Sequence, residues 1–181
     1  MDILFFDKLI TIIPIIVSIL SAVISGKIYK INEKSNKDRE EREKIHEVSQ
    51  IFPYVLDSEY RLNSVKVCNN SDYPIYDVMI LEGINTSNIY AGENCCQAEY
   101  IRLIAPLEHV TIRVQNRGLG MCKFLVVGIF FRDYLGNEWF RDSYGTFKEA
   151  KGYKELLARK KLIFAPYSES RNIVDKRPYR N

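Results

Sequence analysis

Near the start of the chain, eighteen consecutive residues carry no charge: Leu9 to Gly26 reads LITIIPIIVSILSAVISG. As an α-helix this run would be about 27 Å long at about 1.5 Å per residue, close to the ~30 Å hydrocarbon core of a bilayer. Pro14 removes one backbone donor, which membrane helices tolerate near an end. The run therefore predicts a transmembrane anchor in residues 1–26.

Two other interpretations of this run stay open, a cleaved signal peptide and a buried helix of a soluble domain. Secretory signals normally carry net positive charge before the apolar run. Here the preceding residues hold Asp2 and Asp7 against a single Lys8. The anchor is therefore favoured over the signal peptide.

Basic residues are concentrated on one side of the run. Only Lys8 precedes it, whereas seven Lys or Arg residues follow it within residues 27–44. Because cytoplasmic flanks of membrane helices collect Lys and Arg, we expect the N-terminus outside and the rest of the chain in the cytoplasm. Lys27, Lys30 and Lys34 are then placed to contact anionic lipid headgroups.

Small residues recur every four positions along the run, at Ser18, Ala22 and Gly26. This spacing lets two membrane helices approach closely, so a homodimer through this face is one interpretation. Small residues are also common near the end of a span. A monomeric anchor is therefore the other interpretation, and the sequence slightly favours it.

Residues 27–51 predict a charged helical stalk. Pairs of opposite charge at i,i+4, such as Glu33 and Lys37, favour a helix. A coiled-coil seam would place Ile28, Ile31 and Ile45 at core positions, but half of the core positions of that seam are polar. We expect a solvated stalk, or a weak coiled coil at most.

Residues 52–149 alternate between apolar and polar side chains, which is typical of half-buried strands. Turn residues, a polar loop at 84–98 and Pro106 separate the strands. This pattern predicts an antiparallel sandwich or small barrel. The expected strands are 60–69, 74–83, 99–105, 109–115, 123–132 and 138–143.

The strand at 123–132 is apolar on both faces, so both faces need a cover. One cover is the facing sheet. For the other we expect a helix from about Lys151 to Lys161, which carries Leu156 and Leu157. A partner protein or a second subunit is the alternative cover.

Residues 150–181 are predicted to form a basic C-terminal helix and tail. Residues 151–181 hold nine Lys or Arg against three Asp or Glu. Arg159, Lys160 and Lys161 are candidate contacts for anionic lipid. Nucleic-acid binding is disfavoured because the net charge of the chain is only +3, and a partly ordered, solvated tail is the alternative.

Two short segments have the character of a family motif. Asn69 to Val78 reads N-x-S-x-x-P-I-Y-D-V, and Phe131 to Arg141 reads F-x-D-x-x-G-x-x-W-x-R. With the N-terminal run, they resemble a functionally uncharacterised group of bacterial single-pass membrane proteins. The resemblance implies a transmembrane helix, a charged stalk helix and a mainly β, antiparallel immunoglobulin-like β-sandwich. It implies no activity.

The second segment contains a candidate site. Arg132, Trp139 and Arg141 form a candidate pocket for an anion or a partner protein. The interpretation we favour is that these residues brace a hairpin, with the arginines stacked on Trp139 or paired with Asp133 or Asp142.

The sequence lacks the usual signs of catalysis and of metal binding. Its four cysteines and two histidines do not have zinc-site spacing, and no P-loop, dinucleotide-binding or metalloprotease motif is present. We therefore expect no catalytic residues, metal or cofactor. The favoured function is a membrane-tethered cytoplasmic module that binds lipid and an unknown protein partner. The alternative is a membrane-acting effector of the bacterial defence type, whose soluble domain senses a ligand or oligomerises.

Overall fold

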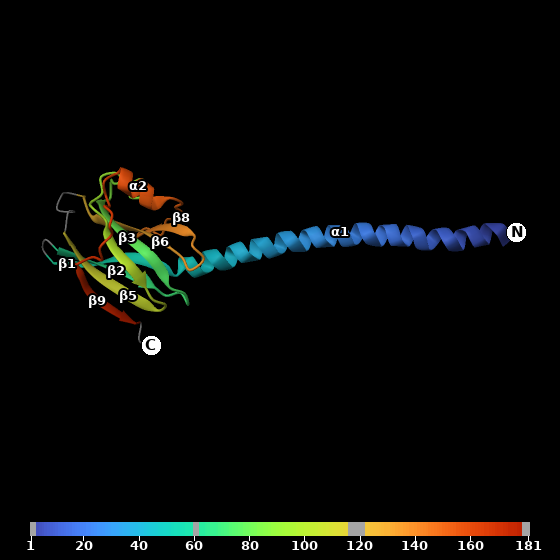
Figure 1. The fold of residues 1–181 in the computed structure, drawn as a ribbon, viewed down its shortest axis with the longest axis horizontal. Helices are drawn as coiled ribbons and strands as arrows, with labels where there is room; N and C mark the ends of the chain where they lie inside the picture. Colours follow the sequence, from blue (N-terminus) through green and yellow to red (C-terminus); the bar gives the residue numbers. More distant parts are fainter. Residues whose placement is uncertain (1–2, 60–61, 116–121, 179–181) are drawn as a thin grey trace. The chain divides into compact units, whose positions relative to one another are not determined.

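The computed structural model describes residues 3–59, 62–115 and 122–178 (Figure 1). Within these ranges, the side chains of residues 3–16, Ile19, 57–59, Leu62 and Gln115 are outside the description. The chain divides into two units, residues up to Ile45 and residues from His46 onward.

Helix α1 (Ile3–Ser49) is continuous through the predicted anchor and stalk. On the stalk, Lys37 pairs with Glu33 at 2.7 Å, as the i,i+4 spacing predicts. The predicted span Leu9–Gly26 lies partly outside the described side chains. Within the described part of the chain, no helix has the length and apolar character needed to cross a bilayer.

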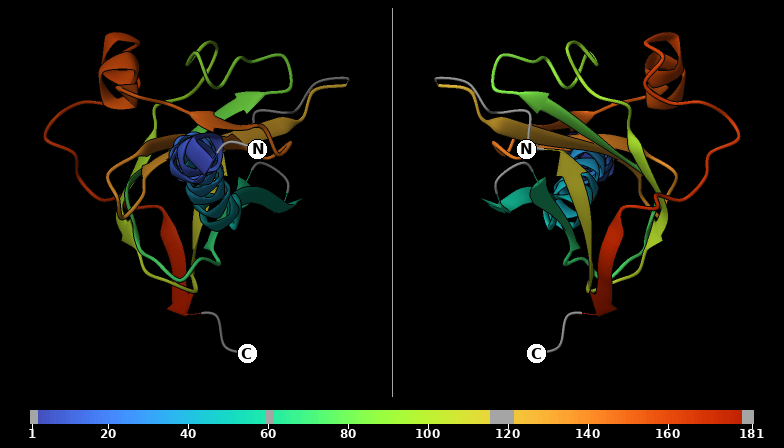
Figure 2. Two further views of the ribbon diagram at one scale, coloured as in Figure 1. Left: turned by 90° about the vertical axis from the view of Figure 1, so that its right-hand side faces the viewer. Right: turned by 90° about the vertical axis from the view of Figure 1, so that its left-hand side faces the viewer.

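The unit from His46 onward is a two-sheet antiparallel β-sandwich, as the strand pattern predicts (Figures 1 and 2). One sheet has the order β1-β2-β5-β9 and the other the order β4-β3-β6-β7-β8. The first sheet comprises β1 (Ile51–Glu59), β2 (Leu62–Asn69), β5 (Glu108–Gln115) and β9 (Ile173–Pro178). The second comprises β4 (Glu99–Ile104), β3 (Ile75–Ile84), β6 (Leu125–Arg132), β7 (Glu138–Asp142) and β8 (Phe147–Glu149).

The strand pattern did not predict β1, the short strand β8 or β9. β1 contains Pro53 and begins at Ile51, the last residue of the predicted stalk, because α1 already ends at Ser49. Proline is tolerated here because β1 is the edge strand of its sheet. β9 lies in the stretch that was interpreted as a tail, and it pairs with β5 from Ile173 to Pro178.

Strand β6 is covered on both faces, as its apolar composition predicts. Val127, Ile129 and Phe131 belong to the core between the sheets. Val126 and Phe130 belong to a second core on the outer face.

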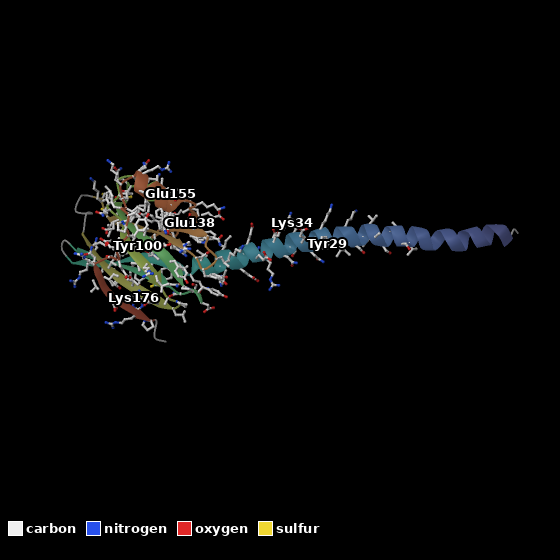
Figure 3. All side chains as sticks on the ribbon, viewed as in Figure 1. Tyr29, Lys34, Tyr100, Glu138, Glu155 and Lys176 are labelled. Atoms are coloured by element: carbon white, nitrogen blue, oxygen red, sulfur yellow. The ribbon has the colours of Figure 1, made fainter. Side chains whose placement is uncertain are left out.

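The second core is closed by α2 (Tyr153–Arg159) and the residues that follow it, which confirms the predicted C-terminal cover. Tyr153 and Leu157 of the helix are buried there, together with Leu162 and Ile163 beyond it. Glu138 fixes the start of α2, since its carboxylate accepts a hydrogen bond from the Gly152 amide at 2.5 Å (Figure 3). The cover of the outer face therefore comes from the chain itself.

Candidate functional site

The first motif forms the crossover between the two sheets. The Asn69 side chain is buried, and its amide donates hydrogen bonds to the carbonyls of Tyr73 (2.8 Å) and Ala105 (3.0 Å). Its Oδ1 accepts a hydrogen bond from the Ser71 hydroxyl at 2.6 Å. These bonds hold the chain as it passes from β2 to β3 and tie it to the residue after β4, so the motif is structural.

The second motif is organised by Asp133, which is 5% exposed. One carboxylate oxygen accepts hydrogen bonds from the amides of Leu135 (2.9 Å) and Asn137 (2.8 Å). The other accepts from the Asn137 side chain (2.9 Å) and from the Trp139 indole (2.8 Å). Gly136 completes the turn with φ 89°, the left-handed conformation expected at this position.

The candidate set Arg132, Trp139 and Arg141 does not converge on one pocket. Trp139 points into the core between the sheets and stacks on Phe147 at 4.9 Å. Phe131 is the residue that pairs with Trp139, and because neighbouring strand residues face opposite sides, Arg132 lies on the other face.

In the structure both arginines make contacts that the sequence did not suggest. Arg132 pairs with Asp77 at 3.1 Å, and its guanidinium lies over the Tyr76 ring. Arg141 donates hydrogen bonds to the backbone carbonyl of Ser49 and, at 3.1 Å, to that of Ile51. Burial lowers the pKa of Arg141, and the charge of Asp142 opposes this shift. Arg141 therefore joins the end of α1 to the sandwich.

The other predicted contact residues are exposed side chains. The three basic residues Arg159–Lys161 include one with an acidic neighbour, since Lys160 Nζ lies 3.9 Å from Glu93 Oε1. Six of these predicted contact residues lie in the unit up to Ile45: Ser18, Ala22, Gly26, Lys27, Lys30 and Lys34. The other three lie around the end of α2: Arg159, Lys160 and Lys161. The predicted lipid and dimer contacts stay predictions.

A polar cluster that the sequence interpretation missed surrounds Asp77. This residue occupies a β-bulge of β3, where φ is 53° and the register with β6 shifts. The bulge presents its carboxylate to Lys154 of α2 (2.8 Å) and to the Tyr100 hydroxyl, which donates a hydrogen bond at 3.0 Å. The Tyr153 hydroxyl donates to the Asp77 carbonyl at 2.6 Å. The bulge therefore attaches α2 to the sheet.

Electrostatics within this cluster follow from its contacts. Burial by itself would raise the pKa of Asp77, but the hydrogen bonds from Lys154 and Tyr100 and the charge of Arg132 hold that pKa below its usual value. Burial, with the Asp77 carboxylate next in importance, raises the pKa of Tyr100 to about 12. Asp77 is thus stabilised as a carboxylate and Tyr100 as a neutral phenol.

A pocket of about 340 Å³ lies next to this cluster, between the start of β4 and residues 160–172, here called the strap. The strap leads from α2 to β9 along the edge of β4 (Figure 2). The Ala98 amide donates to the Leu162 carbonyl and the Ser170 amide to the Tyr100 carbonyl, both at 2.8 Å. Tyr100 therefore belongs both to the Asp77 cluster and to the pocket wall (Figure 3).

The four cysteines all lie among the described residues, and they form no disulfide bond. Cys68 is buried, and burial raises the pKa of its thiol. Burial also raises the pKa of Cys95 to about 11, with Cys96 and Glu93 adding to the shift. Cys122 is exposed. Among the described residues, no group of three or more His, Cys, Asp or Glu is placed to hold a metal ion.

Comparisons of the chain with protein-family models, with curated proteins and with solved structures find no match. Function must therefore be inferred from the sequence and the geometry of the chain itself.

Proposed function

We propose that the chain is a non-catalytic binding module held at the cytoplasmic face of a membrane by Leu9–Gly26, with its N-terminus outside. The observation that carries this proposal is the uncharged run of eighteen residues, which is followed by seven basic residues within 27–44. Its length matches a bilayer core, and its charge asymmetry sets the orientation. A homodimer through Ser18, Ala22 and Gly26 belongs to the same proposal.

We further propose that the sandwich is immunoglobulin-like. The order β1-β2-β5 in one sheet and β3-β6-β7 in the other supports this assignment, since it corresponds to strands A-B-E and C-F-G of that fold. Both faces of β6 are covered by the chain itself. Partner binding then falls to the surfaces that stay exposed, namely loop 84–98, the pocket beside the strap and the basic cluster Arg159–Lys161.

The tether is tested by one substitution inside the run and a matched one outside it. Val17 and Ile45 lie on the same helix and are 55% and 49% exposed. Val17→Arg places a charge near the middle of the run, which costs about 2.5–3.5 kcal/mol of insertion free energy. We expect Val17→Arg to move protein from the washed membrane fraction to the soluble fraction, and Ile45→Arg to leave it membrane-bound. Soluble wild-type protein would refute the tether.

Growth of cells that overexpress the chain distinguishes the binding module from the alternative, a membrane-acting effector. A binding module predicts normal growth when the wild-type chain is overexpressed, together with capture of a specific partner by crosslinking. Growth arrest that the Val17→Arg variant relieves would favour the membrane-acting effector.

A further inference from the structure

The pocket between β4 and the strap has the dimensions of a small-ligand site. Its volume of about 340 Å³ falls in the ~300–1,000 Å³ range that is typical of ligand pockets. Met79 and Ile163, both buried, contribute apolar surface to its lining. The remaining lining residues include aromatic and charged side chains.

Aromatic side chains form part of the wall. The rings of Tyr100 and Tyr167 are 5.6 Å apart and tilted by 43°, so they form a corner and not a parallel stack. Phe164 also lines the pocket and is 62% exposed, although the two residues before it are buried. These rings offer electron-rich faces to a ligand.

The charges of the lining favour a cation. Its charged side chains are Glu99, Glu169 and Arg171, so two carboxylates against one guanidinium give a net charge of −1. The Tyr100 hydroxyl donates a hydrogen bond to Asp77, and donation to a carboxylate increases the electron density of the phenol ring. Outside the lining, the Lys154 ammonium lies 5.8 Å from the centroid of Tyr167, and its charge is paired with Asp77 at 2.8 Å.

We propose that this pocket binds an organic cation, an ammonium or guanidinium group on an apolar stem. The cation would lie against Tyr100 and Tyr167 and pair with Glu169, and the stem would contact Met79. A free amine and a Lys or Arg side chain of a partner protein share this chemistry. The inference rests on the proposed function as a binding module and supplies the class of ligand for it.

The test compares a cation with a neutral molecule of the same shape. Full-length chain in detergent micelles is titrated with butylguanidine and with butylurea by calorimetry. We expect butylguanidine to bind at least about tenfold more tightly, because only its charged group gains from the rings and Glu169. Equal affinity, or no binding of butylguanidine, would overturn the proposal.

Variants then locate the site. Glu169→Gln and Tyr167→Leu should each weaken butylguanidine binding about fivefold or more. Glu155→Gln removes the same charge from α2 outside the pocket lining and should leave binding unchanged (Figure 3). Circular dichroism checks that each variant is folded. Binding that none of these substitutions changes, or that all three weaken equally, would contradict the assigned site.

A third titration identifies the source of the cation. A short arginine-containing peptide that binds more tightly than butylguanidine, and depends equally on Glu169, indicates a protein partner. Weaker binding of the peptide indicates a free amine. The Val17→Arg variant should keep its affinity for butylguanidine, so failure of the pocket and failure of the membrane tether are told apart.

Discussion

At the residue scale, the β6–β7 hairpin depends on the carboxylate of Asp133. We expect Asp133→Ala to lower the free energy of unfolding by about 2–4 kcal/mol, because the buried Trp139 indole and the turn amides lose a charged acceptor. Asp142→Ala is the matched control. Asp142 accepts hydrogen bonds from the amides of Tyr144 and Thr146 in the next turn but holds no indole. Urea denaturation measures both, and equal losses would contradict this role of Asp133.

The Asp77 cluster predicts how stability depends on pH. The folded-state pKa of Asp77 is lowered, so its contribution to stability is present above the ordinary Asp value of about 4 and is lost as pH falls through the folded value. The pKa of Tyr100 is raised to about 12, so its contribution is present below about pH 10 and is lost as pH rises toward 12.

Asp77→Asn should therefore reduce the loss of stability below about pH 4, relative to the wild type. The measurement is the urea midpoint at a series of acidic pH values for both proteins. Parallel curves for variant and wild type would show that Asp77 is not linked to folding in this way.

The sequence identified Arg132, Trp139 and Arg141 as a group because they lie close together along one predicted hairpin. It did not give their partners, since these depend on strands and helices that are distant in the chain: Arg132 contacts β3, and Arg141 contacts the end of α1. Asp77 belongs to the first motif, but its role was overlooked because a bulge is not visible in an alternating pattern. One signal was present, a charged residue at the start of the apolar run VMIL.

At the scale of elements, β9 is a structural strand and not a solvated tail. It pairs with β5 along Ile173–Pro178, and Lys176 donates a hydrogen bond to the Leu103 carbonyl of β4 at 3.0 Å (Figure 3). We expect deletion of residues 173–181 to lower the free energy of unfolding by about 2–4 kcal/mol, because β5 loses its pairing with β9 and Ile173 no longer packs against the core.

Deletion of residues 179–181 alone is the control for this truncation, because it leaves β9 complete. Thermal denaturation of the two shortened chains and the wild type gives the comparison. Equal stability of all three would restore the interpretation of this stretch as a solvated tail.

The apolar strands were predictable, and the sheet in which each lies was not. β6 was recognised because its apolar residues face both sides, and the need for two covers pointed correctly to α2. β9 has only Ile173 and Val174 in a polar, basic stretch, so its conformation depends on pairing with β5. The pocket could not be predicted either, because the strap that forms one of its walls was interpreted as part of the tail.

At the scale of the whole molecule, the account depends on one uncharged run near the N-terminus and on the asymmetry of the charges around it. The two units then have separate tasks in the proposal: residues up to Ile45 hold the protein at the membrane and the sandwich binds the partner. The proposal therefore requires the sandwich to lie on the cytoplasmic side of the membrane.

Cys122 offers a direct measurement of that location, because it is exposed on the sandwich, whereas Cys68 is buried and Cys95 and Cys96 are partly buried. Spheroplasts are treated with a membrane-impermeant maleimide before and after permeabilisation, with Cys122→Ser as the control. We expect the membrane-bound chain to be labelled at Cys122 only after permeabilisation. Labelling of Cys122 in intact spheroplasts would place the sandwich outside the cell and contradict the proposed orientation.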